Sequence, residues 1–149
     1  VVAAGAAPLA VGGDHSISLP ILRAVEKPPR GPVGLVHFDA HPDTCDVVDA
    51  SSPNYATPFR RSADEGLNDP TRHVMISIRG MMSTSAPYDW ARDNEVTVLT
   101  SDDVENLGAK GIINKIREVV GDEPIYVTFD LDGLDSVYSP GTGMAKPGG

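Results

Sequence analysis

The chain has 149 residues, of which 40% are hydrophobic, and its 21 acidic and 12 basic side chains give a formal net charge of −9 at pH 7. This hydrophobic content excludes intrinsic disorder and predicts one globular domain over residues 1–149. The negative charge argues against nucleic acid and acidic membrane surfaces as partners. The apolar runs are far shorter than the roughly 20 residues that span a bilayer, and no targeting signal is visible. Cys45 is the single cysteine. We therefore expect a cytoplasmic protein without disulfides.

The sequence predicts an alternation of short strands and helices. The strand runs are apolar enough to be buried on both faces of a sheet. One helix is signalled by the N-cap residue Thr57 before Pro58, and another by an apolar face that Gly121 terminates. In chain order, we expect a strand at Pro8–Val11, a helix at Ser18–Val25, a strand at Gly34–Phe38, a helix from Pro58 to Gly66, strands at Val74–Ile78 and Val96–Leu99, a helix at Gly111–Val120 with Ile112, Ile113, Ile116, Val119 and Val120 on its inner face, and a strand at Ile125–Phe129.

Strands that alternate with helices predict βαβ units, and therefore a parallel sheet with helices on both faces. The expected fold class is a three-layer α/β/α arrangement. A Pro/Gly-rich stretch, Pro140–Gly149, closes the sequence without a further element that would return to the sheet. We therefore expect the sheet to be incomplete at both ends.

Three segments place metal-binding side chains directly after predicted strands. The first carries a histidine after two glycines, the second has Asp, His and Asp at alternate positions, and the third has two Asp at alternate positions. Alternate residues of an extended backbone point to the same side. Because the carboxyl ends of parallel strands meet at one edge of the sheet, we expect these side chains to converge in one cleft: His15, Asp39, His41, Asp43, Asp130 and Asp132.

The charge of this cluster predicts metal ions. Four carboxylates within a few ångströms of one another cannot all stay ionised without a cation, and two divalent ions supply four positive charges. Imidazole and carboxylate ligands together suit Mn²⁺, with Ni²⁺, Co²⁺ or Fe²⁺ as alternatives, and they differ from a closed cysteine-rich zinc site. Two such ions, roughly 3.5 to 4 Å apart, activate a bridging water. The sequence therefore indicates a hydrolase.

The motifs GGDHS (12–16), HFDAHPD (37–43) and TFDLDGLD (128–135) resemble the metal-binding signatures of the ureohydrolase family of arginases and agmatinases. Residues 58–61, 64–67, 76–80 and 139–143 resemble its agmatinase and guanidinobutyrase branch. The resemblance implies the arginase-like α/β/α fold, hydrolysis of a small guanidino substrate to urea and an amine, and assembly as a homo-oligomer, a trimer or hexamer, or as a hetero-oligomer with a homologue. It also implies two Mn²⁺ ions, one held by His15, Asp39, Asp43 and Asp130 and one by Asp39, His41, Asp130 and Asp132.

Two catalytic roles follow from the same resemblance. Asp132 is expected to orient the hydroxide that attacks the guanidinium carbon. Tyr55 stands where agmatinase-like enzymes have a proton-shuttling histidine, and a phenol with a pKa near 10 is a poor proton shuttle at neutral pH. Members of the family are also considerably longer than this chain.

These departures leave two alternatives open. One is a non-catalytic or degenerate subunit that keeps the fold for assembly or regulation, and the other is a deacetylase-like amidohydrolase that uses one zinc ion. We interpret His37 as a core histidine, with contact to a metal ligand as the second reading, and His73 as a surface residue. Cys45 is expected to be incidental rather than a nucleophile, and Arg60 and Arg61 to lie on a solvated or interface face of a helix.

Overall fold

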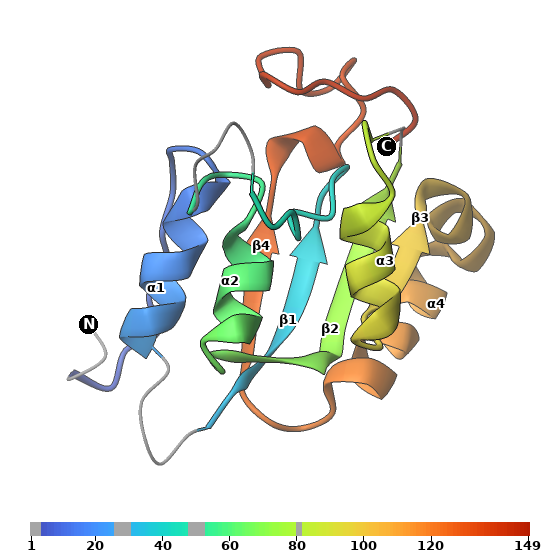
Figure 1. Ribbon diagram of the computed structural model, residues 1–149. Coiled ribbons are helices and arrows are strands. Elements are labelled where there is room, and N and C mark those ends of the chain that lie inside the picture. Colours follow the sequence, from blue (N-terminus) through green and yellow to red (C-terminus); the bar gives the residue numbers. More distant parts are fainter. Residues whose placement is uncertain (1–3, 26–30, 48–52, 80–81) are drawn as a thin grey trace.

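The computed structural model describes residues 4–25, 31–47, 53–79 and 82–149; Gly80, the last residue of one family-like segment, lies outside these ranges. The strands form one parallel sheet in the order β3-β2-β1-β4, and their arrowheads in Figure 1 all point the same way. The predicted parallel sheet is therefore confirmed. The strands are β1 (Val33–Phe38), β2 (Asn68–Ile78), β3 (Thr97–Thr100) and β4 (Ile125–Phe129).

Helices cover both faces of this sheet. Three helices, α1 (Ser18–Val25), α2 (Pro58–Asp64) and α3 (Ala86–Asp93), lie on one face, and α4 (Ser101–Val120) lies on the other (Figure 1). The result is the expected three-layer α/β/α arrangement. Short 3₁₀ turns, η2 (His15–Ile17) and η3 (Leu131–Gly133), complete the described elements. No helix within the described ranges is long and apolar enough to cross a bilayer.

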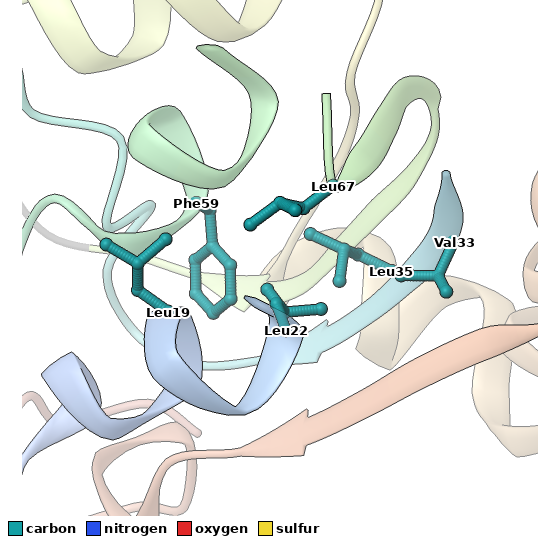
Figure 2. Packing of buried hydrophobic residues seen from close by; sticks show 6 residues of the cluster. All are labelled: Leu19, Leu22, Val33, Leu35, Phe59 and Leu67. Atoms are coloured by element: carbon teal, nitrogen blue, oxygen red, sulfur yellow. The ribbon is translucent and has the colours of Figure 1, made fainter. Parts of the chain in front are cut away.

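The core lies on both sides of β1, whose successive residues alternate between the two faces. Leu35 points into a cluster formed with α1 and α2, in which Leu19, Leu22 and Phe59 surround it (Figure 2). The neighbouring Val36 joins the cluster under α4 on the opposite face. Burial on both faces explains why β1 is an almost continuous apolar run rather than an alternating one.

Helix α4 is longer than the sequence predicts. Its N-terminus is fixed by a capping box, in which Thr100 and Asp103 satisfy each other's backbone amides. Gly108, with φ of 60° and ψ of 174°, interrupts the helix, so the predicted segment Gly111–Val120 is the part that follows this break. Ile112 and Val120 are buried as expected, whereas Ile113 is 48% exposed.

Three expectations about elements are corrected. Pro8–Val11 is not a strand: it pairs with no strand of the described sheet, and Leu9 and Val11 are 92% and 93% exposed. Strand β2 begins at Asn68 rather than Val74: Asn68 pairs with Val33, and after an irregularity the pairing resumes at His73 and Leu35. Helix α3 was not expected.

One face of β4 is left uncovered. Ile125, Val127 and Phe129 point to the side on which α4 packs, but they remain 44%, 57% and 54% exposed. The opposite face is covered by α1, where the hydroxyl of Tyr126 donates to Ser18 Oγ at 3.2 Å. Within the described sheet, β4 is thus an edge strand, and the described residues leave the apolar side chains on one of its faces partly exposed.

Candidate metal centre

The predicted site residues lie together at the carboxyl ends of β1 and β4. A pocket of about 1170 Å³ opens at this edge of the sheet, and its lining includes residues 8–11, which the sequence had placed in a strand. Tyr55 also lines this pocket and is 45% exposed. All six predicted metal-binding residues contribute to the lining: His15, Asp39, His41, Asp43, Asp130 and Asp132.

A first cluster is centred on His15. Its Nδ1 atom lies 2.9 Å from Asp43 Oδ2, 3.1 Å from Asp39 Oδ2 and 3.3 Å from Asp130 Oδ2. One nitrogen carries at most one proton, which can serve only one of these three oxygens. A metal ion with several ligands satisfies all of them, so this donor set fits a cation.

A second cluster is centred on His41. Its Nδ1 atom lies 3.0 Å from Asp132 Oδ2 and 3.5 Å from Asp39 Oδ1. Asp39 therefore directs one carboxylate oxygen to each cluster, which is the arrangement of a bridging ligand. Asp130 Oδ2 contacts His15 of the first cluster. Its other oxygen, Oδ1, accepts the backbone N–H of Asp132 at 2.9 Å rather than a contact from His41.

The charges in the cluster depend on one another. Burial opposes a charge on His15, but the carboxylates of Asp130, Asp39 and Asp43 outweigh it and raise the pKa of His15 to about 12. Asp132 is the main cause that raises the pKa of His41 to about 10. The cluster without metal therefore holds protons that a metal ion would displace.

The four carboxylates divide into two pairs by the direction in which their pKa values are shifted. Burial raises the pKa of Asp43 and of Asp132. Burial also opposes ionisation of Asp39, but its histidine neighbours lower its pKa overall, and His15 lowers the pKa of Asp130. This separation is the expected response of like charges held close together without a cation.

A tight turn before η2 places His15. Gly12 and Gly13 adopt positive φ angles of 111° and 68°, which disfavour residues with a Cβ. The Asp14 carboxylate then accepts the Ser16 N–H at 2.9 Å and caps η2. On the far side of the ring, His15 Nε2 lies 2.8 Å from Thr128 Oγ1. With Nε2 directed at this hydroxyl, Nδ1 faces the carboxylates and is the ring atom that would bind a cation once its proton is displaced.

Asp132 is placed by contacts that link β1, β2 and η3. The backbone N–H of Ala40 donates to Asp132 Oδ1 at 3.1 Å. The guanidinium of Arg79, at the end of β2, donates to the carbonyl oxygens of Asp132, Gly133 and Leu134 at 2.6, 3.1 and 3.1 Å. The sequence gives no sign of these roles of Arg79 and Thr128, because their partners are distant in the sequence.

The remaining expectations have mixed outcomes. His37 is fully buried, as expected of a core histidine, and its Nε2 lies 2.8 Å from Asp39 Oδ2, so it also makes the contact with a metal-binding candidate that was the second reading. His73 is fully buried in β2, and the expectation of a surface residue is wrong. Burial raises the pKa of Cys45, as suits an incidental thiol. Arg60 and Arg61 pair with Asp46 on a partly exposed face of α2.

The comparisons with known proteins agree with this geometry. The Arginase family model matches residues 1–149. The chain is 44% identical to the mitochondrial agmatinase of Gallus gallus over all 149 of its residues, which are 44% of that protein, and 45% identical to the guanidinopropionase of Pseudomonas aeruginosa, of which it covers 46%. The structure of proclavaminate amidino hydrolase from Streptomyces clavuligerus superimposes with a TM-score of 0.83 at 43% identity, over 93% of this chain and 44% of that one.

The fold and the site together define an α/β protein with a His/Asp cluster that could bind metal ions at the carboxyl edge of a parallel sheet. With a family match over its whole length, the chain belongs to the arginase family. It spans less than half the length of the curated relatives it matches.

Proposed function

We propose that this protein hydrolyses a guanidino compound to urea and an amine, using two Mn²⁺ ions. The observation that carries the proposal is the position of Asp39, whose two carboxylate oxygens face two separate histidine-centred clusters at the wall of one pocket. The names of the relatives, an agmatinase, a guanidinopropionase and an amidino hydrolase, support the substrate class.

The residues present would hold the two ions as follows. His15, Asp39, Asp43 and Asp130 would bind the first ion, and Asp39, His41 and Asp132 the second. The two ions would supply hydroxide near neutral pH from a bridging water. Asp132 lines the pocket and is fixed by Ala40 and Arg79, so its carboxylate would orient the attacking oxygen. Tyr55 lies on the pocket wall as the candidate for proton transfer to the leaving amine.

The test is release of urea by the Mn²⁺-loaded protein from agmatine, 4-guanidinobutyrate, 3-guanidinopropionate and arginine. We expect turnover of at least one of the first three compounds and loss of turnover in Asp39→Asn. Two bound ions without turnover of any guanidino compound would overturn the proposal, and one ion per chain would instead favour the zinc amidohydrolase alternative. The cytoplasmic location and the trimeric or hexameric assembly stay predictions.

A sharper test of the ligand assignment is to measure how many of the two ions each single variant binds more weakly. Asp39→Asn is expected to weaken both ions, because Asp39 faces both clusters. Asp43→Asn is expected to weaken only the first ion, because Asp43 contacts His15 alone of the two site histidines. Isothermal titration with Mn²⁺ measures both numbers. Equal effects of the two variants would contradict the assignment of Asp39 as the bridging residue.

A further inference from the structure

One buried histidine contacts the site without facing the pocket. His37 lies on β1 two residues before Asp39, so the two side chains share one face of the strand. The His37 side chain is fully buried, and its Nε2 lies 2.8 Å from Asp39 Oδ2. An ionised carboxylate only accepts hydrogen bonds. The proton of this contact therefore belongs to His37 Nε2, which donates to Asp39.

The His37 donor completes the fixation of the Asp39 carboxylate. The other oxygen, Oδ1, accepts the backbone N–H of His41 at 2.7 Å. Each oxygen of Asp39 is thus held by a donor from its own strand end and faces a histidine of one cluster, His15 or His41. If this carboxylate rotated, Oδ2 would move away from His15 and Oδ1 would move away from His41.

The ring of His37 is itself locked by its neighbours. It packs against Phe59 of α2 with ring centroids 4.3 Å apart and lies edge-on to His15 at 5.3 Å. A side chain held on two sides in the core keeps one rotamer. This packing makes His37 a rigid donor rather than one of several mobile contacts.

We propose that His37 is a positioning residue, which holds the Asp39 carboxylate in the orientation that bridges the two ions without binding an ion itself. This inference rests on the proposed function in one respect only, the presence of two ions at the site. Contacts of this kind between a ligand and a supporting residue typically change metal affinity by 10- to 100-fold.

The test uses two amide variants whose donors differ in position. The side-chain nitrogen of Gln reaches the place of the imidazole Nε2, whereas that of Asn reaches the place of Nδ1, which points away from Asp39. We expect His37→Gln to bind Mn²⁺ within a few-fold of the wild-type affinity, and His37→Asn and His37→Phe to bind both ions roughly 10- to 100-fold more weakly. Isothermal titration measures the affinities, and thermal unfolding without metal measures the packing cost of each variant.

Three outcomes overturn the proposal. Equal losses of affinity in His37→Gln and His37→Asn would show a packing role alone, and an unchanged affinity in His37→Asn would show no role. Nuclear magnetic resonance of the imidazole nitrogens during titration with diamagnetic Zn²⁺ provides the third: the Nε2 proton of His37 is expected to persist, and its loss would make His37 a ligand. If the affinities follow the expected order but no urea is released, the proposed function fails and this inference stands. If the wild-type protein binds no ion, both fail.

Discussion

His73 shows how a buried histidine couples stability to pH. It is fully buried, and neither of its ring nitrogens has a hydrogen-bond partner among the residues that the structure describes. Burial, together with the nearby His37, lowers its pKa well below the usual value. In the unfolded chain a histidine titrates near pH 6.5. Below that pH the unfolded chain binds a proton that the folded chain does not, so the free energy of unfolding falls as the pH falls.

His73→Leu, which keeps an apolar side chain at this position, is expected to reduce this loss of stability in acid. The difference between variant and wild type should grow below pH 6.5 by up to about 1.4 kcal/mol per pH unit. Urea unfolding of the metal-free protein between pH 5 and 7.5 measures it. Because His15 and His41 contribute equally to the pH dependence of both proteins, only the difference reports on His73. Parallel stability curves would contradict the prediction.

At the scale of residues, the sequence predicts the side chains at the site but not what supports them. The six metal-binding candidates are polar residues in or beside otherwise apolar segments of the sequence, and the structure brings all six together. Thr128 and Arg79 escape prediction because their partners depend on which strands are neighbours. His73 is misplaced because an imidazole beside an arginine in the sequence gives no sign of which sheet face it occupies.

The elements most clearly predicted are those whose apolar residues are buried by neighbours. Helix α1 has the predicted bounds, and β1 and β4 differ from prediction by one residue at most. Pro8–Val11 has the same composition as these strands but no partner in the described sheet, and apolar residues alone do not form a strand without one. Helix α3 has Pro87 and Ala91 as its buried residues, so few apolar side chains mark it in the sequence.

The turn η3 approaches the end of β1 closely at Gly133, where a side chain would require the backbone to shift. A Cβ on Gly133 would lie 3.2 Å from the Asp39 backbone nitrogen and 3.3 Å from its Cα. Gly133→Ala is therefore expected to move η3 away from the end of β1, to destabilise the fold by about 1 to 3 kcal/mol and to weaken Mn²⁺ binding through Asp132. Gly141→Ala is the matched control, because its Cβ would meet no atom within 4 Å. Equal effects of the two variants on thermal unfolding would contradict this explanation.

At the scale of the whole molecule, metal binding is expected to stabilise the fold. Removing the ions leaves four carboxylates facing two histidines. A ligand that binds only the folded state raises the free energy of unfolding by about 2.7 kcal/mol when its free concentration is about 100 times Kd. Chelation should then lower the melting temperature by about 5 to 10 °C for a chain of this size. Differential scanning calorimetry before and after verified metal removal measures the change. An unchanged melting curve would contradict the prediction.

The open face of β4 predicts concentration-dependent self-association. An edge strand with exposed apolar side chains is a template for pairing with a second copy. Ile125→Lys places a charge on this face and is expected to reduce association in sedimentation velocity experiments. Ile113→Lys is the control, because Ile113 is similarly exposed, at 48%, but lies on α4 rather than on β4. A monomeric wild-type protein at all concentrations, or an equal effect of both variants, would contradict the prediction.

The distance in sequence between the site residues has a consequence for the order of folding. His15 and Thr128, which touch at the site, are 113 residues apart, and Ala40 and Asp132 are 92 apart. The centre can therefore form only after β1 and β4 have come together, and we expect this to follow the rate-limiting step of folding. Contacts that form after the rate-limiting step slow unfolding and leave the folding rate nearly unchanged. The ions would then slow unfolding, and so prolong the lifetime of the native state, without speeding up folding.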